Sequence, residues 1–188
     1  MFKRLIASIL SIALLVSFGL MFFCMGAAAQ AQTLVPVETP VPLPSTLLHT
    51  GKGVETTLAN VLQEKGKSHY YLIHLWAPSC RACVPEMKQL DKIQTSLSKQ
   101  GFTLVSIAQD PNGSFTVPAF ERRHEITTIN SYIDEKASMI RTLRPAGLPT
   151  TYLATPDGLI IAFHEGAMDW EHMGALKTAS SAPIPNVQ

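Results

Sequence analysis

Cysteine is scarce in this chain, which has three among its 188 residues. Cys24 lies in an apolar stretch near the N-terminus, so only Cys80 and Cys83 remain in the rest of the sequence. A small secreted scaffold that is stapled by disulfides needs more cysteines, spread along its chain. A four-ligand structural zinc site also needs more ligands, and the sequence contains no second Cys-x-x-Cys and no His-x-x-x-His. These absences leave one isolated pair of thiols to be explained.

An excess of charge of either sign is also absent. The chain has 15 basic and 14 acidic residues and a formal net charge of +1, so its composition gives no sign of a nucleic-acid partner. The sequence has no internal repeat. Its length leaves room for one domain with appendages, and a hydrophobic content of 46% is sufficient for a real core.

The first 31 residues have the pattern of a targeting segment. Lys3 and Arg4 precede an uncharged apolar run over 5–25, and small residues follow. Such a run predicts either a cleaved signal peptide or an N-terminal membrane anchor. Cys24 follows Phe22 and Phe23, where lipid attachment would need small residues, so we assign it to the apolar run. Both interpretations place the rest of the chain in the periplasm or another extracytoplasmic space.

The remainder of the chain divides into three parts by its composition. Four prolines lie within 32–46, a segment typical of a semi-rigid polyproline linker. Residues 47–179 carry alternating strand and helix patterns, and we expect 180–188 to be a disordered tail. We predict strands over 70–76, 102–108, 150–154 and 159–164, and helices over 81–99, 117–125, 137–144 and 169–179. This order predicts an α/β fold with a mixed sheet of four or five strands.

The segment 76–83, which reads WAPSCRAC, carries the chemistry. It places Cys80 and Cys83 one helical turn apart, directly after an apolar strand. At a helix N-terminus, backbone N–H groups and the macrodipole stabilise a thiolate. The pattern therefore predicts thiol–disulfide exchange, with a pair of inert core residues as the alternative.

Several motifs together resemble the thioredoxin-like superfamily, and in particular its exported TlpA/ResA-type thiol–disulfide oxidoreductases. The resemblance rests on segment 75–83 with Glu86-Met87 after it, on Gly147-Leu148-Pro149-Thr150, on Pro156-Asp157-Gly158, and on 166–170, which reads GAMDW. It implies a thioredoxin-like fold in which helices flank a mixed central sheet. Residues 115–134 fall where this branch inserts a helix and a strand.

The resemblance also implies roles for individual residues. Cys80 would attack a disulfide and Cys83 would resolve the mixed disulfide, while a cis Pro149 would lie beside them. We expect Trp76 and Leu148, together with Pro149, to meet the substrate. The dithiol would itself be the redox centre, without a metal or organic cofactor. The partners implied are protein thiols and disulfides, and a membrane-bound or thioredoxin-like electron donor.

The chain departs from this family at positions close to the dithiol. His74 stands where relatives carry a buried acid or amide, so it is either the acceptor of the Cys83 proton or a satisfied core histidine. Glu86, in the first turns of the expected helix, is a second candidate for proton transfer or a helix-stabilising residue. Ser79 and Ala82 replace a bulky residue and a proline, and Pro85 is expected to cost a helical hydrogen bond or to kink the helix.

The sequence leaves the direction of electron flow open, because Arg81 favours an oxidising centre and Glu86 opposes it. Exported TlpA-like proteins are more often reductants, so the resemblance favours a reductase of protein disulfides. Two alternatives remain. His124, His164 and His172 would suit a Sco-like copper chaperone, although its cysteines are spaced differently. A thioredoxin-fold protein that senses redox state by binding a partner is the other. The sequence identifies neither the substrate protein nor the oligomeric state.

Overall fold

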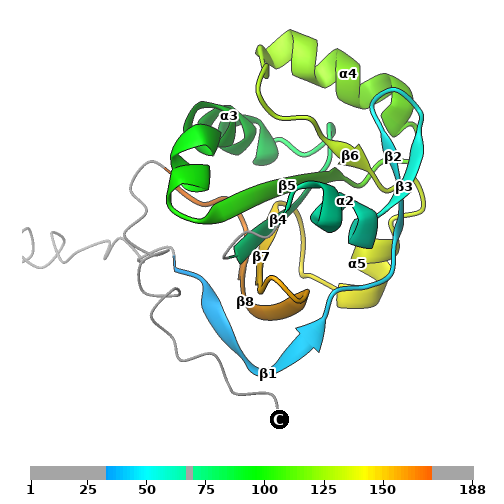
Figure 1. Ribbon diagram of the computed structural model, residues 1–188. Helices are drawn as coiled ribbons and strands as arrows, with labels where there is room; N and C mark the ends of the chain where they lie inside the picture. The colour runs from blue at the N-terminus through cyan, green and yellow to red at the C-terminus, as the bar shows by residue number, and fades with distance from the viewer. Residues whose placement is uncertain (1–32, 67–69, 171–188) are drawn as a thin grey trace, which may run out of the picture. The chain divides into compact units, whose positions relative to one another are not determined.

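The computed structural model describes residues 33–66 and 70–170. The predicted targeting segment and tail, and nearly all of the helix expected over 169–179, lie outside these residues. Figure 1 shows the elements. In chain order they are β1 (Val35–Pro42), β2 (Leu47–Thr50), β3 (Glu55–Thr57), α2 (Leu58–Glu64), β4 (Tyr70–Trp76), α3 (Cys83–Lys99), β5 (Phe102–Ala108), α4 (Gly113–His124), β6 (Tyr132–Ile133), α5 (Ser138–Leu143), β7 (Thr150–Ala154) and β8 (Leu159–Glu165).

The strands of the described residues form one mixed sheet in the order β1-β8-β7-β4-β5-β6-β2-β3. The pairs β4–β5 and β5–β6 are parallel, and the other neighbours are antiparallel. The predicted mixed α/β fold is confirmed, as are the four predicted strands. The expectation of four or five strands was too low, because it missed the peripheral strands. The helix and strand expected within 115–134 are α4 and β6.

The proline-rich segment 32–46 was predicted to be a polyproline spacer, and that secondary structure is wrong for most of it. Val35–Pro42 forms β1, which pairs antiparallel with β8 through Val35↔Phe163 and Pro42↔Leu159. The register shifts between Pro36 and Val41, as at a β-bulge. Proline is tolerated there because an edge strand needs hydrogen bonds on one side only.

Each face of the sheet is covered by a different pair of helices (Figure 1). Even-numbered residues of β4, such as Leu72 and Trp76, pack with α3 and α4 in one core cluster. Odd-numbered ones, such as Ile73 and Leu75, pack with α2 and α5 in the other. All seven residues of β4 are buried, as expected for a strand covered on both faces. Alternation along β4 thereby directs His74 toward α3.

Helix α3 begins at Cys83, two residues later than predicted. Pro85 is therefore its third residue and lies among the first four, whose N–H groups have no partner within the helix. The expected loss of a helical hydrogen bond at Pro85 does not occur for this reason. The buried residues Cys83, Glu86, Met87 and Leu90 follow helical spacing and form the face that meets the sheet.

In the ranges 33–66 and 70–170, no helix combines the length and the apolar character that crossing a bilayer requires.

Candidate active site

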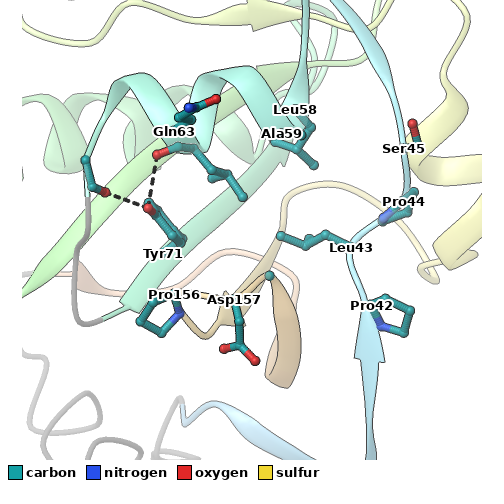
Figure 2. A pocket seen from close by; sticks show the side chains of 13 residues that line it. Pro42, Leu43, Pro44, Ser45, Leu58, Ala59, Gln63, Tyr71, Pro156 and Asp157 are labelled. Carbon is teal, nitrogen blue, oxygen red and sulfur yellow. Dashed lines mark hydrogen bonds between the residues drawn. The ribbon is translucent and has the colours of Figure 1, made fainter.

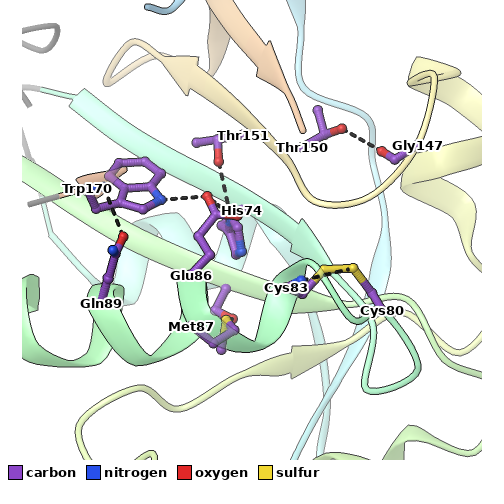
Figure 3. Close-up of polar contacts among 11 residues, drawn as sticks. His74, Cys80, Cys83, Glu86, Met87, Gln89, Gly147, Thr150, Thr151 and Trp170 are labelled. Carbon is purple, nitrogen blue, oxygen red and sulfur yellow. Dashed lines mark hydrogen bonds and ion pairs between the residues drawn. A yellow bond between two sulfur atoms is a disulfide. The ribbon is translucent and has the colours of Figure 1, made fainter. Parts of the chain in front are cut away.

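Cys80 and Cys83 form a disulfide at the junction between β4 and α3 (Figure 3). Their sulfur atoms are 2.14 Å apart and their Cα atoms 5.3 Å apart. The backbone N–H of Cys83 points at Sγ of Cys80, with a separation of 3.2 Å. The side chain of Cys83 is fully buried, whereas that of Cys80 is partly exposed. Of the two cysteines, Cys80 is thus the one with accessible surface.

The loop before β7 carries the predicted cis peptide bond, between Leu148 and Pro149. Thr150 Oγ1 donates a hydrogen bond to the Gly147 carbonyl at 2.7 Å, and the Gly166 N–H donates to the Pro149 carbonyl at 2.8 Å. Leu148 is partly exposed and, like Cys80, packs against the core cluster on the α3 side of the sheet. Pro149 itself is buried, so Leu148 is the residue of this pair with accessible surface.

Trp76 does not occupy the position that was expected of a substrate-binding residue. Its side chain is fully buried, and its ring lies against Phe120 of α4 with centroids 4.7 Å apart. The reason is its even-numbered place on β4, which directs it beneath α4. Trp76 belongs to the core under the site rather than to the surface around it.

His74 belongs to a row of buried polar side chains beneath α3. Across the sheet it faces Thr151 of β7 on one side and Ser106 of β5 on the other. Its Nδ1 lies 3.0 Å from Thr151 Oγ1, and Nε2 has no hydrogen-bond partner among the described residues. Burial lowers the pKa of His74 to about 3, so the ring is neutral at pH 7. The predicted burial and lowered pKa are both confirmed.

Glu86 is the second buried titratable group on this side of the sheet, at 2% exposure. Oε1 accepts a hydrogen bond from the Trp170 indole at 2.5 Å and lies 4.0 Å from His74 Nδ1. Oε2 has no partner among the described residues. Burial raises the pKa of Glu86 to about 7, against hydrogen bonds from Trp170 and the Met168 backbone that lower it. Figure 3 shows the side chains of His74, Glu86 and Trp170 pointing toward one another.

Sequence reasoning placed both cysteines, His74 and Glu86 in one region, but it assigned no role to Trp170 or Thr151. Trp170 appeared only as the last residue of the GAMDW motif. Its position next to Glu86 depends on a contact across 84 residues, which no local pattern encodes. Thr151 follows directly after Thr150 in β7, and only the strand register reveals that it faces His74.

A hollow of 610 Å³ lies near the start of β4, at the end of that strand away from the disulfide. Figure 2 shows its lining of prolines and aliphatic side chains from the β1–β2 connection, α2 and the β7–β8 turn. The hydroxyl of Tyr71 lies 2.6 Å from the Gly66 carbonyl and 3.1 Å from that of Leu62. The Tyr71 hydroxyl is thus bonded within the protein, and none of the residues that line the hollow is a cysteine.

A metal site was one of the alternatives raised by the histidines. Within 33–66 and 70–170, no three or more histidine, cysteine, aspartate or glutamate side chains gather as ligands for a metal ion. His164 lies on β8 and contacts the Thr33 carbonyl through Nδ1 at 3.1 Å. His124 lies against Phe120 with ring centroids 4.4 Å apart and the ring planes tilted by 51°. His172 lies outside the described residues.

The fold is thioredoxin-like, as its similarity to solved structures shows. A thioredoxin-family thiol:disulfide interchange protein from Chlorobium tepidum TLS matches with a TM-score of 0.54 and 21% identity, over 71% of this chain and 90% of that one. StoA from Bacillus subtilis matches with a TM-score of 0.53 and 19% identity, over 74% and 96%. The thioredoxin domain of a thiol-disulfide oxidoreductase from Bacteroides vulgatus matches with a TM-score of 0.55 and 22% identity, over 68% and 88%. No family model matches the sequence.

The fold and the site together define a class: a thioredoxin-fold chain with a Cys-x-x-Cys disulfide at the start of a helix and a cis proline before β7. His74 beneath the dithiol is a departure from the pattern that the resemblance implies, and it lies 4.0 Å from Glu86, which pairs with Trp170.

Proposed function

We propose that this protein is an exported thiol–disulfide oxidoreductase that reduces disulfides in other proteins through Cys80 and Cys83. The observation that carries the proposal is the unequal exposure of the two cysteines in one disulfide at a helix N-terminus. A partly exposed cysteine suits attack on a substrate disulfide, and a buried neighbour suits resolution of the mixed disulfide. Two structural neighbours are named as a thiol-disulfide oxidoreductase and a thiol:disulfide interchange protein, which agrees with thiol–disulfide exchange by this chain.

The reaction begins with the reduced dithiol. The Cys80 thiolate attacks one sulfur of the substrate disulfide, the substrate S–S bond breaks, and a substrate thiolate leaves and takes a proton from water. Cys83 then gives up its proton and attacks Sγ of Cys80. The mixed disulfide breaks, the second substrate thiolate leaves and is protonated, and the Cys80–Cys83 disulfide remains. Two electrons pass to the substrate, and an external dithiol donor must return them for the next turnover.

Glu86 is the acceptor that we assign to the Cys83 proton. It lies one helical turn after Cys83 on the same buried face of α3. Its pKa of about 7 matches proton transfer near neutral pH. His74 was predicted to be either the acceptor or a satisfied core histidine, and a pKa of about 3 makes its ring a weak base. We therefore assign His74 a supporting place in the core rather than proton transfer.

The proposal also includes the direction of electron flow and the location of the protein. A reductase requires a reduction potential near the thioredoxin value of about −270 mV, whereas an oxidase would lie near the DsbA value of about −120 mV. Export rests on the apolar pattern of residues 5–25. Fractionation of producing cells and the mass of the mature protein would distinguish a cleaved signal from a retained anchor.

Turnover of insulin disulfides, with a chemical dithiol as donor, tests the activity. Wild type and Cys24→Ser should reduce insulin, Cys80→Ser should be inactive, and Cys83→Ser should accumulate a mixed disulfide that mass spectrometry detects. If Cys80→Ser reduces insulin as well as wild type, the proposal is wrong. Tight, stoichiometric binding of Cu(I) without insulin turnover would instead support the copper-chaperone alternative. The absence of both would favour redox sensing.

A further inference from the structure

The C-terminal side of the described chain reaches α3 through Trp170. The Trp170 indole N–H donates to Oε1 of Glu86, and the Trp170 backbone N–H donates to Oε1 of Gln89 at 3.1 Å. Trp170 therefore donates two hydrogen bonds to side chains that lie three residues apart on α3, as Figure 3 shows. Trp170 is 2% exposed, so the indole approaches Glu86 in a region from which solvent is largely excluded.

This contact is directed at the carboxyl group and is not simply apolar packing. The His74 and Trp170 rings meet edge-on at an interplanar angle of 86°, with centroids 6.5 Å apart. His74 thus packs against the indole from β4, while Thr151 holds the imidazole from β7. His74 of β4, Glu86 of α3 and Trp170 after β8 thus form one buried group. Oε1 of Glu86 lies close to both the imidazole and the indole.

We propose that Trp170 is a positioning residue for Glu86: its indole N–H fixes the carboxyl group and so sets the pH at which the Cys80–Cys83 centre resolves mixed disulfides. This inference rests on the proposed function. Trp170 acts through Glu86, and we place it in contact with neither the sulfurs nor the substrate.

The direction of the effect follows from which form of Glu86 the indole favours. An N–H donor stabilises the carboxylate more than the neutral acid, so the indole opposes burial and lowers the pKa of Glu86. The Met168 backbone N–H acts the same way from the same segment. From β4 the group facing Glu86 is His74, which stays neutral above about pH 3, and from β7 it is the uncharged Thr151. On α3 itself, Cys83 lies one turn earlier and is the proton donor.

The experiment measures the resolution step by itself. Reduced full-length protein is mixed with an aromatic nitrobenzoate disulfide whose released thiolate is coloured. The first release reports attack by Cys80, and the second reports attack by Cys83 on the mixed disulfide. The rate of the second release is recorded from pH 5 to 9 for wild type, Trp170→Phe, Glu86→Gln and Trp76→Phe.

Trp170→Phe keeps a ring in the core but removes the donor, so the midpoint of the second phase should rise by about one pH unit. Glu86→Gln should abolish that titration. Trp76→Phe is the matched control, because it removes a buried indole whose N–H has no acceptor among the described residues, and it should leave the midpoint in place. The first phase should keep its pH dependence in Trp170→Phe.

An unchanged midpoint in a folded Trp170→Phe, or an equal shift in Trp76→Phe, would overturn the inference. If Trp170→Phe does not fold, Gln89→Ala provides the test. It removes the hydrogen bond to the Trp170 backbone N–H without emptying the core, and it should raise the midpoint by a smaller amount. Insulin turnover separates the two proposals. If wild type turns over insulin but Trp170→Phe shows no shift in midpoint, only the role of Trp170 is wrong. If wild type does not turn over insulin, the proposed function is wrong.

Discussion

His74 Nδ1 lies 3.0 Å from Thr151 Oγ1, and both residues are almost completely buried. The pair joins β4 to β7 through side chains as well as through the backbone ladder. A buried hydroxyl that loses its partner costs about 1–3 kcal/mol. The hydrogen bond between His74 and Thr151 therefore stabilises the sheet beneath the disulfide.

His74→Ala should lower the free energy of unfolding by about 2–4 kcal/mol at pH 7, because it empties a buried site and leaves Thr151 unpaired. His74→Asn should cost less, since its side chain can still bond to Thr151. The folded pKa of about 3 lies below the unfolded value of 6.5, so the unfolded state binds more protons between these values. The stability of wild type relative to His74→Asn should then be constant above pH 6.5 and fall as the pH drops toward 3. Urea unfolding across this range checks both results, and parallel pH profiles would refute the second.

Glu86 should produce the opposite pH dependence. Its folded pKa of about 7 lies above the unfolded value of 4.5, so its contribution is fully present below pH 4.5 and is lost as the pH rises through 7. Relative to wild type, Glu86→Gln should gain on the order of 3 kcal/mol of unfolding free energy between pH 4.5 and pH 8. Glu38→Gln, on the exposed side of β1, is the control and should follow wild type. Urea titrations at pH 5 and pH 8 measure the difference, and a constant gap between Glu86→Gln and wild type would contradict the burial effect.

Asp91 on α3 should hold the loop that leads to β6. Its carboxylate accepts backbone hydrogen bonds from Thr127, Thr128 and Ile129 at 2.8–3.2 Å. Partial burial acts to raise the pKa of Asp91, but these hydrogen bonds outweigh it and hold the pKa below its usual value. Asp91→Ala should lower the unfolding free energy by about 1–2 kcal/mol, with a smaller loss for Asp91→Asn.

The matching measurement for Asp91 is amide hydrogen exchange. The three donor amides should exchange faster in Asp91→Ala, while those of β4 stay protected. Because the pKa is depressed, the contribution of Asp91 is present above pH 3.8 and disappears as the pH falls through the folded value. Unaltered exchange at the three amides would show that the loop is held by other contacts.

Gly113, at the start of α4, tests the packing of the inserted helix against β6. A Cβ atom at this position would clash with the side chain of Ile133, which is fully buried and branched at Cβ. Gly113→Ala should therefore cost about 1–3 kcal/mol. Gly51→Ala is the matched control, because its Cβ would meet nothing within 4 Å, and it should leave stability within about 0.5 kcal/mol of wild type. Equal thermal midpoints for the two variants would mean that Ile133 yields without cost.

The sequence predicted those parts of the fold that have a long pattern of their own. β4, β5, β7 and β8 have five to seven residues and continuous or alternating apolar character, and all four were predicted. β6 has two residues and β3 has three, which is too short to show any periodicity. These strands form because their neighbours hold them in register, and a linear sequence does not display that information.

In the candidate site, too, the features with a local sequence motif were predicted and those that depend on tertiary contacts were not. Cys80 and Cys83 were identified from a motif that lies within four residues, and the cis bond before Pro149 from another. The balance between His74 and Glu86 could not be predicted, because it depends on depth of burial and on the Trp170 hydrogen bond. Position in the sequence indicates which groups lie near the dithiol, and only the tertiary environment determines which of them titrates near neutral pH.

β1 has a consequence for how the protein behaves among other proteins. Three of its eight residues are prolines, which have no N–H to offer to an approaching strand. At the opposite edge, β3 has three residues and leads directly into α2. The two borders of the sheet that the described residues form are thus poor templates for a foreign β-strand, a property that guards against edge-to-edge aggregation. If the protein acts on disulfides of other proteins as proposed, these borders would limit strand pairing with its substrates while contact is made at the disulfide.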